Sequence, residues 1–449
     1  MSMDMVMKRL GAAQQSPRPG QRPGGAAPKV DERDLLDRVR QSLYAEVSKA
    51  QLEDQSEESK KALRARIVTV LRAEAPGLSK AREAALAQEM MDDLFGWGPI
   101  SQCLQDPEIT EVMVNSPDDI WVERGGVLEK TDLRFRDEDH IMSVVQKIVG
   151  PIGRRVDESS PMVDARLPDG SRVNAVVKPL CLKGPVVTIR RFGKRLTAED
   201  YVRLGSISQE TLDFLGKCVA AKANILITGG TGTGKSTFLN VLSAFIPSGE
   251  RIITIEDSAE LELQQPHVVG LEARPANMEG KGAVSIRDLV RNSLRMRPDR
   301  IIVGEARGPE ALDLLQAMNT GHEGSLATIH ANTPKDAIER LAVMMMMAGE
   351  EIPHSAILQQ IASSLDLIVH LSRMRDGSRK VTEISEVGAV GPDGQVEVRP
   401  VWKYELDPGS GEAVTGRLVP TGHVPRKLKA KFEWRNLPFD AGLFGGDAP

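Results

Sequence analysis

Residues 223 to 242 read ANILITGGTGTGKSTFLNVL. An apolar run, residues 223–228, leads into GGTGTGKS at 229–236, which fits the phosphate-binding pattern G-x-x-x-x-G-K-[ST]. Residues 237–242 follow with apolar positions at helical spacing. A strand, a glycine-rich turn and a helix start are the context in which this pattern binds phosphate, because backbone N–H groups and the positive helix N-terminus both favour an anion. The stretch therefore predicts an α/β fold with a nucleoside triphosphate site.

The whole loop is expected to take part in binding. Lys235 is placed to reach the β and γ phosphates, and the Ser236 hydroxyl is placed to bind Mg²⁺. The candidate nucleotide-binding residues are Gly229, Gly230, Thr231, Gly232, Thr233, Gly234, Lys235, Ser236 and Thr237.

Three further apolar runs downstream each end in an ionisable residue. They are 251–255 before Glu256, 300–304 before Glu305, and 325–329 before His330. Helical patterns separate them, which predicts alternating strands and helices with a parallel sheet. Ligands of such sheets bind beyond the carboxyl ends of the strands. We therefore expect the three side chains to gather near the phosphate loop.

Charge suggests a role for each of these side chains. Hydrolysis of a triphosphate needs cations near its oxygens and a water molecule aligned with the γ phosphate. Glu305 is the candidate Mg²⁺ ligand, directly or through water, and Glu256 the candidate to polarise the water. Asp257 and Glu260 are the alternatives to Glu256. His330 is expected to sense the γ phosphate or to hydrogen-bond Glu305, although a histidine at a strand end is often only structural.

Three motifs together carry a resemblance to a known family. The stretch TIEDSAELEL (254–263) resembles the acidic Asp box, IIVGEAR (301–307) an atypical Walker B motif, and GHEGSLATIHAN (321–332) the His box of type II/type IV secretion ATPases. That superfamily builds hexameric RecA-like motors for secretion or pilus assembly. The resemblance implies ATP as the nucleotide, with Mg²⁺, and ATP hydrolysis as the activity.

Within that superfamily the chain is most similar to the CpaF-like ATPases of tight-adherence (Flp) pilus assembly. The shared stretches are FGWGP (95–99), TEVMVN (110–115) and DARLPDGSR (164–172), and the resemblance spans about residues 90 to 400. It implies that Arg172 and Arg190 reach the γ phosphate, a role that suits the fixed donors of guanidinium. It also implies a homo-hexamer that acts on an inner-membrane pilus platform.

The expected fold class is α/β, with a RecA-like P-loop motor domain whose central sheet is rich in parallel strands, preceded by an α+β domain and a helical bundle. The expected parts are a disordered basic tail (1–30), a helical bundle (31–94), an α+β N-terminal domain (95–192), a linker (193–205), the RecA-like ATPase domain (206–404) and a C-terminal tail (405–449). We expect this tail to be mostly irregular, with one short helix.

Composition narrows the function classes. The net charge of −5 and the 4% aromatic content argue mildly against a nucleic-acid motor, so no direct nucleic-acid partner is expected. No apolar run approaches the roughly 20 residues of a membrane span. We therefore expect a cytoplasmic protein, and the resemblance to pilus-assembly ATPases implies that it reaches the inner membrane through partners. A VirB11-like effector or DNA secretion ATPase, a RecA-like nucleic-acid motor and a nucleotide-gated scaffold stay open as alternatives.

Overall fold

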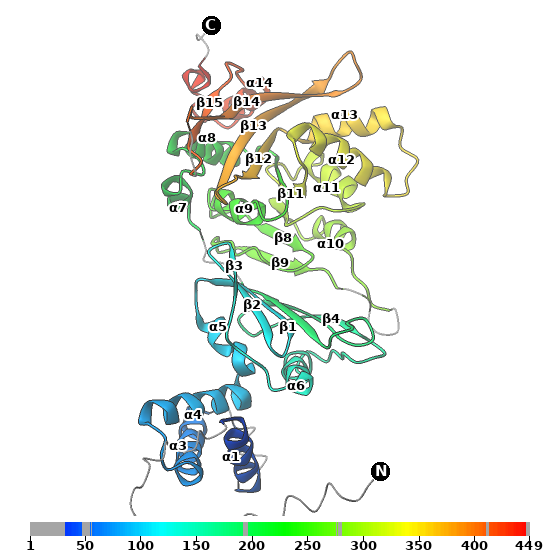
Figure 1. Cartoon of the computed structure of the whole chain (residues 1–449). Coiled ribbons are helices and arrows are strands. Elements are labelled where there is room, and N and C mark those ends of the chain that lie inside the picture. The colour runs from blue at the N-terminus through cyan, green and yellow to red at the C-terminus, as the bar shows by residue number, and fades with distance from the viewer. Residues whose placement is uncertain are drawn as a thin grey trace, which may run out of the picture. The chain divides into compact units, whose positions relative to one another are not determined.

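The computed structural model describes residues 32–46, 54, 56–191, 196–274, 276, 281–409 and 413–445 (Figure 1). The basic tail predicted for residues 1–30 and the start of the predicted linker, 193–195, lie outside the described residues. Contacts divide the chain into two compact units. The first holds the described residues up to Val122, with Glu129–Ala165 and Val173–Ile189, and the second holds Glu123–Leu128, Arg166–Arg172 and the described residues from Arg190 onward.

The first unit begins with three helices around a small apolar core. They are α1 (Glu32–Glu46), α3 (Glu57–Glu74) and α4 (Lys80–Phe95). Ser56 and Ser79 cap the last two, each accepting a backbone N–H three residues on, as N-cap hydroxyls do. The residues buried between the helices include Leu35, Val39, Leu43, Ile67, Leu71, Leu86 and Met90.

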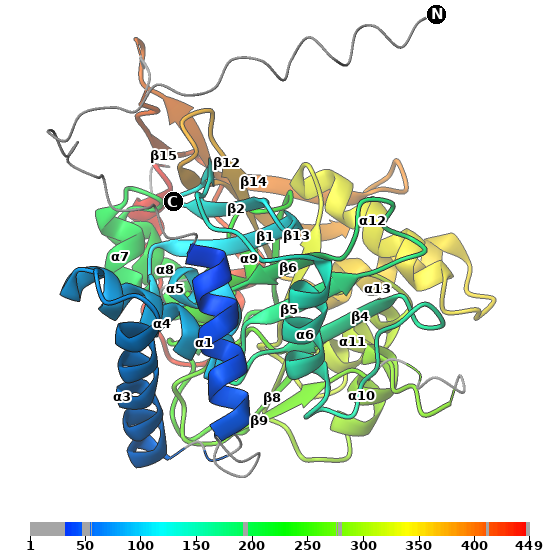
Figure 2. The ribbon, with the colours of Figure 1, turned by 60° about the horizontal axis from the view of Figure 1, so that its bottom comes forward.

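A six-stranded sheet forms the rest of the first unit, with strand order β3-β2-β1-β6-β5-β4. The strands are β1 (Ile109–Ser116), β2 (Asp119–Arg124), β3 (Val127–Lys130), β4 (Met162–Arg166), β5 (Arg172–Val176) and β6 (Val186–Arg190). Short helices η1 (Gly98–Ile100) and α5 (Ser101–Gln105) precede it, and α6 (Glu138–Val149) lies along the sheet (Figure 2). Burial alternates along β5 and β6, which is the pattern of strands with one buried face.

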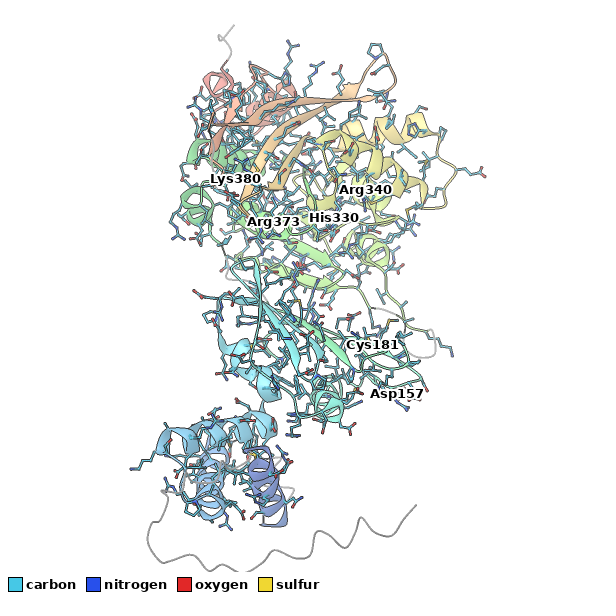
Figure 3. The ribbon with its side chains drawn as sticks, viewed as in Figure 1. Asp157, Cys181, His330, Arg340, Arg373 and Lys380 are labelled. Atoms are coloured by element: carbon cyan, nitrogen blue, oxygen red, sulfur yellow. The ribbon has the colours of Figure 1, made fainter. Side chains whose placement is uncertain are left out.

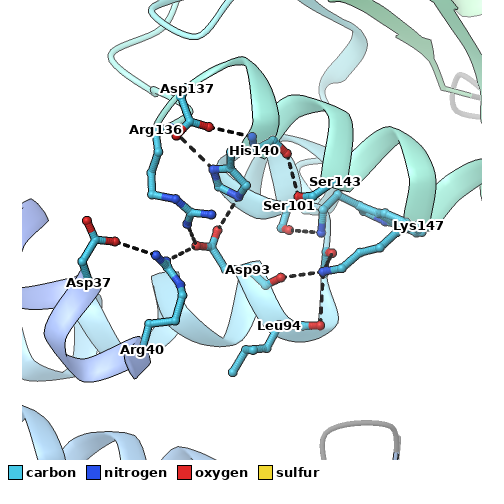
Figure 4. Close-up of polar contacts among 12 residues, drawn as sticks. Asp37, Arg40, Asp93, Leu94, Ser101, Arg136, Asp137, His140, Ser143 and Lys147 are labelled. Carbon is cyan, nitrogen blue, oxygen red and sulfur yellow. Dashed lines mark hydrogen bonds and ion pairs between the residues drawn. The ribbon is translucent and has the colours of Figure 1, made fainter. Parts of the chain in front are cut away.

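A carboxylate on α4 joins the helices to the sheet part of the first unit (Figure 4). The Asp93 side chain accepts from Arg40 of α1 at 2.8 Å and from Arg136, and it lies 3.1 Å from the His140 ring of α6. Lys147 donates to the backbone carbonyls of Asp93 and Leu94. Burial opposes ionisation of Asp93, but the hydrogen bond and charge of His140, with the two arginines, outweigh it and lower the pKa of the carboxyl.

We expect Asp93→Asn to lower the free energy of unfolding of the first unit by about 2 kcal/mol, because it removes the anion that pairs with the largely buried Arg40 guanidinium and with the exposed Arg136. A carboxyl with a depressed pKa stabilises the fold above its unfolded pKa and loses that contribution as pH falls through the folded pKa. The difference in the free energy of unfolding between the variant and wild type should therefore become smaller at acidic pH. Calorimetry against pH measures it. Asp37→Asn, which removes an exposed partner of Arg40, is the control and should change little; equal effects of the two variants would contradict the expectation.

The second unit is built on a nine-stranded sheet with order β15-β14-β13-β12-β7-β11-β10-β8-β9. The strands from β12 to β9 in this order run parallel, and β13, β14 and β15 continue the sheet antiparallel to their neighbours. The bounds are β7 (Ile225–Gly229), β8 (Ile252–Glu256), β9 (Val268–Glu272), β10 (Arg300–Val303), β11 (Leu326–His330), β12 (Leu367–Arg373), β13 (Arg379–Val390), β14 (Val396–Leu406) and β15 (Gly416–Pro420).

Helices bury both faces of this sheet, so β7, β8 and β10 are buried at every position, as strands covered on both sides are. One apolar cluster joins the sheet to α10–α13, and another joins it to α7, α8, α9 and α14. The bounds are α7 (Ala198–Arg203), α8 (Gln209–Ala220), α9 (Lys235–Ser243), α10 (Ile286–Ser293), α11 (Glu310–Asn319), α12 (Pro334–Met346), α13 (His354–Ser364) and α14 (Arg426–Trp434). The predicted α/β class, with a parallel-rich central sheet behind a phosphate loop, is confirmed.

The segment after Leu406 is more regular than the sequence predicts. It contains β15, α14 and the short helix η2 (Ala441–Phe444). Phe432 and Phe444 are buried against Phe214 of α8. Lys427 and Lys431 of α14 lie 3.3 Å and 2.8 Å from the buried carboxylate of Asp366. Ring packing and these ion pairs fix a segment in which no apolar period is visible.

No helix in the described part of the chain is long and apolar enough to span a membrane.

Candidate nucleotide-binding site

The phosphate loop connects the central strand β7 to α9. Gly232 and Gly234 have φ of 71° and 90°, a conformation that glycine adopts without a steric penalty. Gly229 approaches β12 so closely that a Cβ there would lie 2.4 Å from the carbonyl oxygen of Leu371. Within the loop, the Thr233 hydroxyl donates to the Gly230 carbonyl at 3.0 Å. The glycines therefore serve the local backbone geometry that a phosphate-binding turn requires.

Lys235, His330 and Glu305 come together at the carboxyl ends of three adjacent parallel strands, β7, β11 and β10. Lys235 Nζ donates to the Gly230 carbonyl at 2.9 Å and lies 3.4 Å from His330 Nδ1. His330 Nε2 lies 2.8 Å from Glu305 Oε1. Figure 3 labels His330 in the second unit. Of the three side chains predicted to gather near the loop, His330 and Glu305 are in this contact series, whereas Glu256 is not part of it. The roles of all three toward a nucleotide stay predictions.

Burial and charge set the ionisation of this group. Burial, followed by the charge of Lys235, lowers the pKa of His330, which favours a neutral ring. Burial also lowers the pKa of the Lys235 ammonium, against the opposing effect of Glu305. For Glu305, burial is outweighed by the hydrogen bond from Arg307 and by neighbouring positive charge, so the pKa of this carboxyl is lowered. Glu305 is thus an anion beside a neutral histidine.

The two oxygens of Glu305 differ in a way that fits a cation. Oε2 accepts from Arg307 at 2.7 Å. Oε1 is buried and has no hydrogen-bond donor among the described residues, its contact with His330 lacking hydrogen-bond geometry. A buried carboxylate oxygen without a donor is a suitable ligand for Mg²⁺, directly or through water. Ser236, in the first turn of α9 and half-buried, offers a second oxygen of the type that Mg²⁺ prefers.

Glu256 is buried at the end of β8 and engaged by its own loop. Its carboxylate accepts the backbone N–H groups of Glu260 at 2.7 Å and Leu261 at 3.1 Å. Burial raises the pKa of Glu256 to about 7 despite these two hydrogen bonds. A Cβ on Gly304 would lie 2.8 Å from Glu256 Cγ, so the glycine of the Walker B-like motif makes room for this side chain. A carboxyl that titrates near neutral pH has the proton affinity of a general base.

Arg172 lies beside the acidic box, in the segment Arg166–Arg172 that belongs to the second unit. Its guanidinium is 3.0 Å from Glu260 and donates to the Ser258 carbonyl at 2.9 Å. Its Nε is buried without a hydrogen-bond partner among the described residues. Arg190 ends β6 and is exposed. The roles proposed for both arginines at the γ phosphate stay predictions.

Two arginines that the sequence did not single out also lie here. Arg307 pairs with Glu305 and lies 4.0 Å from Asp257, so its positive charge lies between two carboxylates of the site. Arg166 contacts Ser258, the Ala259 carbonyl at 3.0 Å and Glu272 at 2.9 Å. Arg307 lies within the motif IIVGEAR and Arg166 within DARLPDGSR. Their positions inside these two motifs are the sequence feature from which a place near the site could have been predicted.

Comparison with known proteins gives one consistent family. A family model described as type II/IV secretion system protein matches residues 93–401. A putative conjugal transfer protein of Mycobacterium tuberculosis is 36% identical over 322 residues, which cover 70% of this chain and 90% of that protein. The type IV secretion system protein VirB11 of Brucella suis is 33% identical over 323 residues, which cover 65% of this chain and 89% of that protein.

Among solved structures, the VirB11 ATPase from the Brucella suis type IV secretion system, in complex with sulphate, is 31% identical. The match covers 66% of this chain and 97% of that one, with a TM-score of 0.36. The sequence matches cover most of this chain and nearly all of each relative. The chain therefore belongs to the type II/IV secretion system protein family.

Proposed function

We propose that this chain hydrolyses ATP with Mg²⁺ at the phosphate loop, and that it uses the energy to assemble a tight-adherence type IV pilus. The observation that carries the hydrolysis is the contact series Lys235–His330–Glu305 across the ends of β7, β11 and β10. It supplies a cation, a neutral ring and a carboxylate oxygen without a donor at one edge of the sheet.

Each of these residues has a separate task in the proposed reaction. Lys235 and the N–H groups of residues 229–237 hold the phosphates, and Ser236 and Glu305 hold Mg²⁺, which neutralises charge on the β and γ phosphates. Glu256 polarises the attacking water. His330 stays neutral, so it can accept from Lys235 and follow the position of the γ phosphate. Arg172 and Arg190 add positive charge as the γ phosphate leaves.

The pilus assignment rests on the stretches shared with CpaF-like ATPases, FGWGP, TEVMVN and DARLPDGSR. In this proposal the chain works as a homo-hexamer in the cytoplasm, attached to the inner membrane through a pilus platform protein. Hydrolysis would weaken the contacts of Arg172 and Arg190 with the nucleotide. The loss of these contacts would allow the domains of each subunit to move as rigid bodies.

A second candidate is an effector or DNA secretion ATPase. The 33% identity with VirB11 and the 36% identity with a putative conjugal transfer protein favour it. The two candidates share the ATP chemistry and differ in what the motor moves, so a measurement of the effect of DNA tests the DNA-transport form of the second candidate.

The deciding measurement is ATP turnover by the purified chain with Mg²⁺, over a range of protein concentrations, with and without DNA. Lys235→Ala serves as the blank. We expect turnover per subunit to rise with protein concentration, because an assembling ring completes its sites, and to be unchanged by DNA. Strong stimulation by DNA would overturn the pilus assignment in favour of DNA transport. Turnover no higher than that of the blank would overturn the hydrolase itself.

A further inference from the structure

Two side chains from distant parts of the second unit contact the phosphate loop at its backbone carbonyls. Arg379, the first residue of β13, donates from Nε to the Gly232 carbonyl at 2.9 Å. Tyr201 of α7 donates its hydroxyl to the Gly234 carbonyl at 3.4 Å. Both also pack on Gly234, where a Cβ would lie 3.3 Å from Arg379 Cδ and 3.5 Å from the Tyr201 oxygen.

Neighbouring contacts fix the position of these two donors. Lys380 is buried and donates to the carbonyls of Leu204 and Gly205 at 3.2 Å and 2.8 Å, just past the end of α7 (Figure 3). Val381 N–H donates to the Ser206 carbonyl at 2.9 Å. The start of β13 is thereby hydrogen-bonded to the residues that follow α7. These bonds fix Arg379 and Tyr201 relative to each other.

The Tyr201 ring is fixed as well, since it lies 5.2 Å from the Phe238 ring of α9. Burial raises the pKa of the Tyr201 hydroxyl, so it stays a donor at neutral pH.

Peptide planarity gives these contacts a consequence for phosphate binding. In a trans peptide the carbonyl and the following N–H point in opposite directions. Holding the Gly232 carbonyl therefore also fixes the N–H of Thr233. The Gly234 carbonyl is already held by the N–H of Phe238 at 2.8 Å, at the start of α9. Of the two side chains, Arg379 therefore controls the peptide that the helix does not.

We propose that Arg379 is a positioning residue for nucleotide binding: it holds the Gly232–Thr233 peptide so that the Thr233 N–H faces the phosphates. This inference rests on the proposed function, since it concerns the same loop. A guanidinium donor is suited to the task because its hydrogen bonds are charge-assisted and it stays protonated at any working pH. Arg379 is exposed, so its replacement leaves no cavity in the core.

The test compares full-length Arg379→Ala with wild type by titration calorimetry with ATP, ADP and inorganic tripolyphosphate. We expect all three ligands to bind about tenfold more weakly, equivalent to ~1.4 kcal/mol, because the loop and not the nucleoside is affected. Turnover at saturating ATP should stay within about twofold, since KM and not kcat carries the loss of uniform binding. The unfolding temperature without ligand should stay that of wild type.

Two further variants sharpen the result. Arg379→Lys should recover part of the affinity, because an ammonium can still donate to the carbonyl. Arg399→Ala removes an exposed arginine of the same sheet that pairs with Glu397, and it should bind all three ligands like wild type.

Unchanged affinity in Arg379→Ala would overturn the inference, as would a loss confined to ATP and ADP, which would indicate contact with the nucleoside. Lys235→Ala separates this failure from that of the proposed function. If Lys235→Ala loses ATP binding while Arg379→Ala keeps it, only the inference falls. If neither variant changes ATP binding, the phosphate-loop site itself is wrong.

Discussion

Lys235→Ala is expected to lower ATP turnover about a hundredfold to a thousandfold, the range seen when one preorganised donor to developing negative charge is removed. Lys235 is buried at the start of α9, where its ammonium contacts the Gly230 carbonyl and His330. No other lysine among the described residues stands in the loop. Its removal takes away the cation closest to the expected β and γ phosphates, so ATP binding should weaken as well.

The same variant has a second readout that needs no nucleotide. After burial, the charge of Lys235 is the largest influence that lowers the pKa of His330. Histidine titration followed by NMR should therefore show a higher pKa for His330 in Lys235→Ala. Lys217→Ala removes an exposed charge from α8 and should change neither turnover nor this titration. If Lys235→Ala turned over ATP as fast as wild type, the phosphate loop could not be the catalytic nucleotide site.

The gathering of Glu305 and His330 beside the phosphate loop was predictable from sequence for a geometric reason. Each side chain ends an apolar run, and the carboxyl ends of neighbouring parallel strands meet at one edge of a sheet. The structure pairs β7 with β11 and β11 with β10, which brings the two side chains to 2.8 Å. Local sequence sufficed because strand direction, and not any long-range side-chain contact, creates the site.

The contacts of Arg307 and Arg379 could not be predicted in this way. Surface arginines are common, and nothing in the spacing of Arg379 marks it as the partner of a carbonyl 147 residues away along the chain. That contact depends on β13 lying two strands from β7, a pairing order that local periodicity does not encode.

The regular structure of the segment after Leu406 was not predicted, for a related reason. Phe432 and Phe444 pack on Phe214, more than 200 residues earlier, and glycine and proline between them interrupt any apolar period. A segment whose stability comes from a few large rings and from buried ion pairs, such as Lys431 with Asp366, gives a weak local signal.

Glu256→Gln is expected to keep Mg-ATP binding and to lower turnover about a hundredfold or more, the contribution typical of a general base. The amide has nearly the shape of the carboxylate, and the N–H groups of Glu260 and Leu261 both donate to the same oxygen, Oε2, so the amide oxygen in that position can keep these hydrogen bonds. ATP affinity and turnover should therefore separate in this variant, whereas a general disruption of the site would lower both.

The alternative carboxylates provide the matched controls. Asp257→Asn changes an exposed neighbour that lies 4.0 Å from Arg307 and should have a small effect. Glu260→Gln alters the partner of Arg172 and should weaken turnover less than Glu256→Gln. If Asp257→Asn retained ATP and lost turnover while Glu256→Gln stayed active, the water-polarising role would move to Asp257.

The pH dependence tests the assignment independently of side-chain shape. Burial raises the pKa of Glu256 to about 7, and only the ionised carboxylate can take a proton from water. Turnover should therefore rise as pH increases through about 7, and Glu256→Gln should lack this rise.

The free energy of unfolding should change in the opposite direction, decreasing as pH rises. The native state binds the proton more tightly than the unfolded state, so the stability that this group contributes below its unfolded pKa is lost as pH rises through about 7. A wild-type turnover that is flat from pH 6 to 8, together with an unfolding free energy whose pH dependence is the same in both proteins, would show that Glu256 does not titrate in this range and cannot be the base.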